Sequence, residues 1–341
     1  MTICKDGYYS RLFITVTHYP ASFFTMDSTL PAIALIGPTG VGKTALSLAI
    51  AEQFGCEIIS VDSMQVYRHM DIGTAKATAE ERARVAHHLL DVVDPDEEYS
   101  VARYIDDASA AMAKIRARGR VALLVGGTGL YLRGLEEGLF TMAEGGDPVV
   151  RERLQARLAE EGADGLHREL AGRDPESAAR IHPNDRYRLL RALEILAVTG
   201  RPWSEHLARS RQRAVLQNVL KLGLTRTREE LYQRINRRVG QMVEQGLLDE
   251  VRDLLARGYG AELKAMQAIG YRHMVEFLAG EHDWQESLDL LARDTRRYAK
   301  RQYTWFRRDP EICWQEPEQH RAVFDLIHRY LAAATTRGTG R

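Results

Sequence analysis

Short apolar runs alternate with helical stretches through the first half of this sequence. Residues 32–36, 57–61 and 121–125 are mostly apolar, as is typical of strands in a parallel sheet that is covered on both faces. Residues 43–54 and 100–118 have the apolar spacing of helices. We therefore predict an α/β fold in which helices flank a parallel sheet.

The pattern changes after about residue 140. Residues 149–207 are charged and helical in spacing, which indicates a helical insertion. Residues 219–224 are expected to return to the sheet, and a capping box of Thr227 and Glu230 begins a further helix. The predicted units are an N-terminal extension that we expect to be disordered, a core in two pieces, the helical insertion, and a C-terminal helix with a flexible tail: residues 1–28, residues 29–140 with 215–320, residues 141–214, and residues 321–341.

Composition excludes several classes of protein. The chain has 341 residues, of which 45% are hydrophobic, so a large core can form. Lys+Arg and Asp+Glu number 47 each, so any nucleic-acid site must come from local clustering of charge. The cysteines, Cys4, Cys56 and Cys313, are few and scattered, which argues against a disulfide framework or a zinc site. No apolar run is long enough to cross a membrane.

The turn after the first predicted strand has the pattern G-x-x-x-x-G-K-[ST], and it stands between a strand and a helix as that motif requires. Backbone N–H groups of such a turn bind a polyphosphate, helped by the positive end of the helix dipole. Lys43 would reach the phosphates, and the Thr44 hydroxyl would be a ligand of Mg²⁺. The motif does not indicate which phosphate compound binds. Its residues are Gly37, Pro38, Thr39, Gly40, Val41, Gly42, Lys43 and Thr44.

Polar residues follow the other predicted strands at the edge where ligands bind in such sheets. Asp62 could be a general base, an indirect partner of Mg²⁺, or the N-cap of a helix, and its position favours a functional role. Thr128 lies in a glycine-rich turn, which suits either a close ligand or an ordinary turn. Arg228 and Arg234 share a predicted helix and could reach the phosphates, although exposed helix arginines are more common.

Two segments concentrate basic and aromatic residues. Residues 296–308 contain six basic residues, four aromatic residues and no acidic residue. Residues 182–191 form a second basic run inside the insertion. Basic groups neutralise phosphates and aromatic rings stack on unpaired bases, so the first segment favours nucleic acid over an amphipathic helix. For the second segment, a helix with a charged face is an equal alternative.

Together these segments resemble the tRNA dimethylallyltransferase family, the bacterial-type tRNA isopentenyltransferases. The resemblance covers about residues 31–310, and DSMQVYRHMDIGTAK at 62–76 together with KRQxTWFR at 300–307 is far more specific than the phosphate loop. The segments that carry it are GPTGVGKT at 37–44, SVDSMQVYRHMDIGTAK at 60–76, HHLLDVVDP at 87–95, LLVGGTGLYLRGL at 123–135, RIHPNDRYRLLRALE at 180–194, AIGYR at 268–272 and AKRQYTWFRR at 299–308.

This resemblance implies a P-loop NTPase-like sheet and a transfer reaction. The dimethylallyl group of dimethylallyl diphosphate would move to N6 of adenosine 37 in tRNA, and pyrophosphate would leave with the help of Mg²⁺ on Thr44. Lys43, Asp62 and Thr128 would be catalytic, with Asp62 as the general base and Thr128 in contact with the target nucleotide and the pyrophosphate. Arg228 and Arg234 would close on the diphosphate.

The resemblance also implies an extended tRNA surface, in which the insertion embraces the anticodon stem-loop. The tRNA-contacting residues would be Asp62, Ser63, Met64, Gln65, Thr128, Arg151, Tyr187, Arg188, Leu189, Leu190, Arg191, Gln267, Ala268, Ile269, Gly270, Tyr271, Arg272, Lys300, Arg301, Gln302, Tyr303, Thr304, Trp305, Phe306 and Arg307. We expect a cytoplasmic monomer that does not bind a membrane.

Three alternative functions stay open on the sequence. An adenylate isopentenyltransferase would perform the same chemistry on free AMP or ADP. A small-molecule P-loop kinase would use ATP, with Asp62 as its base. A non-catalytic RNA-binding module would not need Lys43 or Asp62 at all.

Overall fold

The structure, a computed structural model, describes residues 31–138, 146–210 and 214–338. The predicted extension at residues 1–28 and the last residues of the predicted tail lie outside the described residues. The strands are β1 (Ala32–Ile36), β2 (Cys56–Val61), β3 (His87–His88), β4 (Val121–Gly126), β5 (Val219–Leu224) and β6 (Cys313–Gln315).

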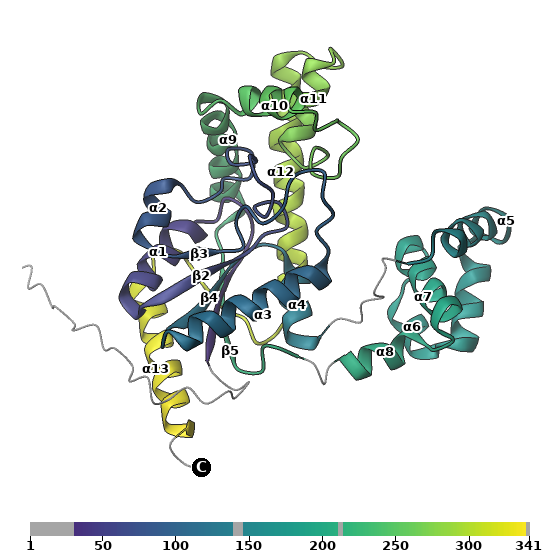
Figure 1. Cartoon of the computed structure of the whole chain (residues 1–341), viewed down its shortest axis with the longest axis horizontal. Coiled ribbons are helices and arrows are strands. Elements are labelled where there is room, and N and C mark those ends of the chain that lie inside the picture. Colours follow the sequence, from purple (N-terminus) through teal and green to yellow (C-terminus); the bar gives the residue numbers. More distant parts are fainter. Residues whose placement is uncertain (1–30, 139–145, 211–213, 339–341) are drawn as a thin grey trace, which may run out of the picture.

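These strands form one parallel sheet in the order β3-β2-β4-β1-β5-β6 (Figure 1). The prediction of a parallel α/β sheet is therefore confirmed, including the return of residues 219–224 to the sheet. β3 and β6 were not predicted, because two or three residues are too few to show a pattern. Every residue of β1 and β2 is buried, since helices cover both faces of the sheet.

Successive residues of a strand face opposite sides of the sheet, and the core divides accordingly. Ile33 and Leu35 pack on one face with helices α1 and α13, whereas Ala34 and Ile36 pack on the other with α3 and α4. The helices of this core are α1 (Lys43–Phe54), α2 (Ala79–Arg84), α3 (Val101–Ala117), α4 (Gly129–Glu137), α9 (Arg228–Glu244), α10 (Leu247–Ala256), α11 (Tyr271–Leu278), α12 (Trp284–Phe306) and α13 (His320–Gly338).

Local sequence signals set where several helices begin and end. The capping box of Thr227 and Glu230 begins α9 as predicted. Gly246 and Gly270 precede α10 and α11 with φ angles of 97° and 102°, where a side chain would be strained. These glycines mark where the two helices begin.

The remaining four helices form a unit beside the sheet (Figure 1). They have a hydrophobic cluster of their own, in which Leu166, Leu170 and Leu189 are completely buried. All four lie within the predicted insertion, whose boundaries at 141 and 214 stay a prediction. The helices are α5 (Pro148–Arg173), α6 (Pro175–Arg180), α7 (Arg186–Thr199) and α8 (Trp203–Ser210).

A half-buried carboxylate on α10 holds the long loop that follows β2. Oε2 of Glu250 accepts hydrogen bonds from the backbone N–H groups of Asp71 (2.9 Å) and Ile72 (2.7 Å). Oε1 accepts from Gly73 N–H (3.1 Å) and from the Tyr271 hydroxyl (2.6 Å). One carboxylate thus joins this loop to α10 and α11, and a Cβ on Gly73 would lie 2.5 Å from the Tyr271 ring.

Replacing Glu250 with Gln should destabilise the protein. Two donors meet each oxygen of the Glu250 carboxylate. In glutamine one of these oxygens is an NH₂ group, which would face two donors and could accept from neither. We expect the free energy of unfolding to fall by about 2 kcal/mol. Urea denaturation measures it, with Asp253→Asn as the control because Asp253 is exposed on the same helix. Equal midpoints for the two variants would contradict the role of Glu250.

Candidate functional site

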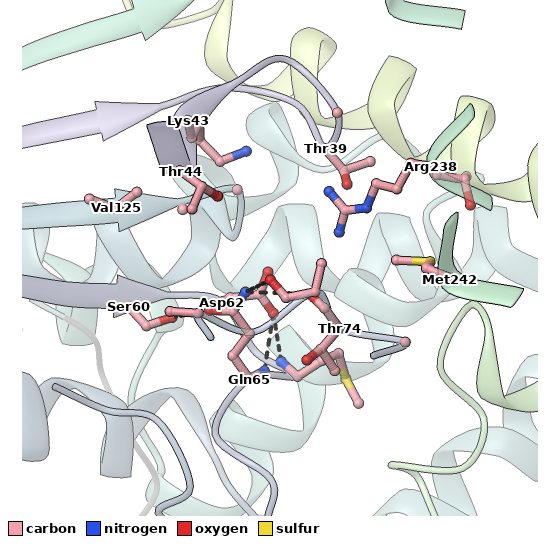
Figure 2. Close-up of a pocket in the computed structure, with 18 of the residues that line it drawn as sticks. Thr39, Lys43, Thr44, Ser60, Asp62, Gln65, Thr74, Val125, Arg238 and Met242 are labelled. Atoms are coloured by element: carbon pink, nitrogen blue, oxygen red, sulfur yellow. Dashed lines mark hydrogen bonds between the residues drawn. The ribbon is translucent and has the colours of Figure 1, made fainter. Parts of the chain in front are cut away.

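A cavity of about 1020 Å³ lies at the carboxyl edge of the sheet. Parallel register brings the strand ends together there, since Gly126 pairs with both Ile36 and Val61. The cavity is lined by the loop after β1, the loop after β2, the turn after β4 and parts of α9 and α12 (Figure 2). The predicted phosphate loop, Asp62 and a stretch of predicted tRNA contacts therefore border one space.

Lys43 lies at the start of α1 and reaches back across the phosphate loop. Its Nζ donates to the carbonyl oxygens of Gly37 and Pro38, both at 2.9 Å. The loop turns sharply at Gly40 and Gly42, whose φ angles are 79° and 117°. Turns of this kind let successive backbone N–H groups point to one side, which is the arrangement that binds phosphate oxygens.

The Lys43 amine is close to half-protonated near neutral pH. Burial is the main cause that lowers its pKa to about 7, and repulsion from Arg238 adds to it, while Asp62 acts in the opposite direction. A neighbouring anion would restore the charged amine. The amine is therefore suited to respond to a negatively charged ligand.

Asp62 follows β2, and only one of its two carboxylate oxygens accepts hydrogen bonds from residues that the structure describes. Oδ1 accepts hydrogen bonds from the backbone N–H groups of Met64 (2.8 Å) and Gln65 (3.3 Å). No helix begins there, so the interpretation as a helix N-cap is wrong, and the residue instead stabilises a turn. Oδ2 has no hydrogen-bond partner among the described residues, and the carboxylate lies at the edge of the cavity (Figure 2).

Thr128 lies beside Asp62 because the turn after β4 is bonded to the end of β2. Its backbone N–H donates to the carbonyl oxygen of Val61 (3.0 Å), and its hydroxyl accepts from Ser63 N–H (3.1 Å). Tyr298 on α12 lines the cavity nearby, where burial and Asp62 raise its pKa to about 12. Sequence reasoning did not identify Tyr298 as a cavity residue.

The helix arginines differ from the prediction in their placement. Arg234 lines the cavity, and its Nε donates to the Gly40 carbonyl oxygen (2.8 Å). The guanidinium group of Arg228 instead lies over the Tyr232 ring, 5.1 Å from its centre, and Arg228 does not line the cavity. Contact of Arg228 with a diphosphate would require it to leave this ring. Arg237 and Arg238, which the sequence did not single out, line the cavity instead.

The predicted tRNA contacts fall into two groups by burial. Several are interior: the side chains of Leu189, Tyr271, Gln302 and Phe306 are buried and support the surface from below. Others are exposed, most of all Tyr187 on α7, whose exposed fraction is 81%. The predicted contacts that line the cavity are Asp62, Ser63, Met64, Gln65, Gln267, Ala268, Ile269, Gly270, Tyr271, Arg301 and Gln302.

Basic residues of the insertion are oriented by a buried carboxylate. Glu194 is 2% exposed and pairs with Arg151 (3.1 Å) and Arg191 (2.7 Å). Both arginines keep part of their side chains at the surface. Arg188 pairs with Asp185 (3.2 Å) on the same helix. These ion pairs thus fix the geometry of three arginines of the insertion.

A family model described as IPP transferase matches residues 65–309, and one described as isopentenyl transferase matches residues 31–92. The tRNA dimethylallyltransferase of Desulfotalea psychrophila is 51% identical over 303 residues, which cover 88% of this chain and 96% of the relative. That of Geobacter metallireducens is 52% identical over 280 residues, covering 82% and 90%.

Solved structures give the same result. The full-length tRNA isopentenylpyrophosphate transferase of Bacillus halodurans superposes with a TM-score of 0.67 at 42% identity, covering 90% of this chain and 98% of the other. A eukaryotic dimethylallyltransferase, crystallised as an enzyme acting on tRNA, superposes with a TM-score of 0.67 at 32% identity, covering 81% and 69%. The P-loop NTPase-like fold is thereby confirmed, and this chain belongs to the IPP transferase family of tRNA dimethylallyltransferases.

Proposed function

We propose that this enzyme transfers the dimethylallyl group from dimethylallyl diphosphate to N6 of adenosine 37 in the anticodon loop of a tRNA, releasing pyrophosphate. The observation that carries the proposal is the single cavity in which a phosphate loop faces an available carboxylate oxygen of Asp62. The phosphate loop is suited to bind a diphosphate, and Asp62 is suited to accept a proton from the attacking amine.

The phosphate side of the cavity assists departure of the leaving group. As the bond between C1 of the allyl group and the diphosphate oxygen breaks, its electron pair goes to the diphosphate. Lys43 and the N–H groups of the loop would stabilise that added negative charge. Arg234, held at the Gly40 carbonyl oxygen, lies within the same lining.

Asp62 would act on the nucleophile. The N6 lone pair forms the new bond to C1, and N6 then gives up a proton to Oδ2 of Asp62. The bonds from Met64 and Gln65 to Oδ1 keep the carboxylate oriented during this step. Thr128 is hydrogen-bonded to the adjacent Ser63 and would help to position the base.

A tRNA substrate must place one base inside this cavity. Removing an adenine from its stack costs least in a single-stranded loop, which favours an anticodon loop over a duplex. The loop at 267–271 and the start of the segment at 300–307 line the cavity. Tyr187 and its basic neighbours on α7 would bind the stem-loop at a distance from the cavity.

Mg²⁺ is part of this proposal. No group of three or more His, Cys, Asp or Glu side chains suited to a metal occurs in the parts of the chain that the structure describes. Thr44 lines the cavity beside Lys43, and one hydroxyl fits an ion that keeps most of its waters and binds substrate phosphates. Bound there, Mg²⁺ would neutralise charge on the diphosphate.

The comparisons favour the tRNA enzyme over the alternative functions. A kinase or an adenylate isopentenyltransferase would have no use for a helical insertion with its own core and exposed arginines beside Tyr187. None of the helices in the described parts of the chain is long and apolar enough to span a bilayer. We further propose that the enzyme is a cytoplasmic monomer.

Asp62→Asn should abolish most of the transfer. Asparagine can still accept the bond from Met64 but cannot take up the N6 proton, so the rate should fall by about 10²–10⁴-fold. Transfer of labelled dimethylallyl to an anticodon stem-loop RNA measures it. Asp106→Asn, at an exposed position on α3, is the control.

The same assay decides between the functions. Label should enter a stem-loop with adenosine at position 37 and not one with guanosine there. Labelling of free AMP instead would identify an adenylate isopentenyltransferase. Absence of label with both acceptors, together with phosphoryl transfer from ATP, would identify a kinase.

Binding of dimethylallyl diphosphate should depend on pH through Lys43. The pKa of this amine is about 7 in the protein, and a bound diphosphate raises it. Binding above pH 7 should therefore take up about one proton, and affinity should fall as pH rises, by up to about tenfold per pH unit. Calorimetry in buffers of different ionisation enthalpy measures the uptake. Lys43→Met should abolish it, whereas uptake unchanged in Lys43→Met would contradict the assignment.

Tyr187→Ala should weaken use of the stem-loop. Loss of one base-stacking ring is expected to raise the KM for RNA by about tenfold, with the KM for dimethylallyl diphosphate unchanged. Val198→Ala is the matched control, because Val198 is another exposed apolar residue of α7, with an exposed fraction of 45%. Equal KM values for the two variants would argue against this surface.

A further inference from the structure

We propose that the hydroxyl group of Tyr298 on α12 recognises the target base, by donating a hydrogen bond to a ring nitrogen of adenine beside N6. This inference rests on the proposed function, because it concerns the base that enters the cavity. Tyr298 lines the cavity from the same face of α12 as Thr295 and Gln302, which lie about one helical turn before and after it.

Three tyrosines interact electrostatically with Asp62, and only Tyr298 among them lines the cavity. Tyr104 and Tyr131 are buried in the core and stack on each other, with their ring centres 3.9 Å apart. Burial raises the pKa of all three hydroxyl groups, and the negative charge of Asp62 adds to this effect. Tyr298 is therefore the tyrosine that can contact a ligand which also contacts Asp62.

The hydrogen bonds of the Tyr298 hydroxyl leave its own proton available. The side chains of Thr128 and Gln302 both bond to it, and both bonds act to lower its pKa, so the phenol oxygen accepts them. Thr128 has a proton to give, because its oxygen already accepts from Ser63 N–H. The Gln302 amide has a second N–H besides the one that donates to Gly127. No residue that the structure describes accepts the Tyr298 proton in return.

The position of this hydroxyl is fixed by its surroundings. The Arg301 guanidinium lies over the Tyr298 ring, 5.6 Å from its centre. Gln302 is itself held by Thr39 N–H (2.9 Å) and the Gly127 carbonyl oxygen (3.0 Å). Burial is the main cause that raises the pKa of Tyr298 to about 12, so the hydroxyl keeps its proton at neutral pH. The cavity therefore contains a positioned hydrogen-bond donor close to the carboxylate of Asp62.

A donor beside an acceptor is complementary to one edge of adenine. Under the proposed function, Asp62 accepts the proton of N6. The ring nitrogens N1 and N7 lie on either side of N6, and both accept hydrogen bonds. The Tyr298 hydroxyl can thus bind N1 on the Watson–Crick edge or N7 on the Hoogsteen edge. Guanine has an oxygen in place of N6, which would face the carboxylate, so the same two groups disfavour guanine.

The test combines Tyr298→Phe, which removes only the hydroxyl, with stem-loop RNAs that carry 1-deazaadenosine or 7-deazaadenosine at position 37. Each analogue replaces one ring nitrogen with a C–H group. We expect Tyr298→Phe to lower kcat/KM for the adenosine RNA by about tenfold, with the KM for dimethylallyl diphosphate unchanged. One analogue should cost the wild-type enzyme at least about fivefold more than it costs Tyr298→Phe, and that analogue identifies the edge.

Tyr259→Phe is the matched control. Tyr259 is also partly buried, but it follows α10 and does not line the cavity. Its kcat/KM should match that of the wild type with all three RNAs. Both variants should keep the wild-type melting temperature, since neither substitution removes a packed ring.

Comparing the same analogue across the two enzymes cancels any difference in the intrinsic reactivity of N6. A merely structural role of Tyr298 would lower the rates with all three RNAs by the same factor. Equal losses with both analogues in the wild type and in Tyr298→Phe would therefore overturn the role of Tyr298 alone. Absence of transfer from the wild type to the adenosine RNA would overturn the proposed function together with it.

Discussion

One buried side-chain amide joins the parts on which the site depends. Oε1 of Gln302 on α12 accepts from Thr39 N–H (2.9 Å) in the phosphate loop, and its Nε2 donates to the carbonyl oxygen of Gly127 (3.0 Å) after β4. A side chain at position 127 would collide with this amide. The distance between the phosphate loop and the turn that carries Thr128 is therefore set by a residue more than 170 positions away from either. Burial makes both bonds obligatory, since an unpaired amide there would be costly.

The strands and most helices were predictable because their signals are local. Continuous apolar runs mark strands that are buried on both faces, and a capping box or a glycine with positive φ marks a helix end within a few residues. Burial of Gln302 was not predictable in this way. It lies in a run of basic and aromatic residues that suggested a surface, yet α12 turns Ala299, Gln302 and Phe306 toward the core. The interpretation as an amphipathic helix was thus correct for one face of this segment.

Some residues of the candidate site could likewise be predicted from nearby sequence, whereas others depend on packing between distant segments. Lys43 and Asp62 could be placed beside each other because parallel strands end at one edge of the sheet. Arg238 could not be found from the sequence, because the face of α9 that meets the phosphate loop depends on packing between distant segments. The sequence made Arg228 and Arg234 equal candidates. The structure separates them, because Arg234 bonds to the Gly40 carbonyl oxygen whereas Arg228 lies over the Tyr232 ring.

The separate hydrophobic cluster of α5 to α8 has a consequence for how this enzyme can change over time. Substitutions on the outer surface of these helices leave the sheet and the cavity unaffected, because the leucines that hold the unit together contact one another and not the core. Under the proposed function, in which these helices bind the stem-loop, RNA preference can therefore change independently of the prenyl transfer. Related enzymes could then differ in the stem-loops they bind while keeping the same residues around the cavity.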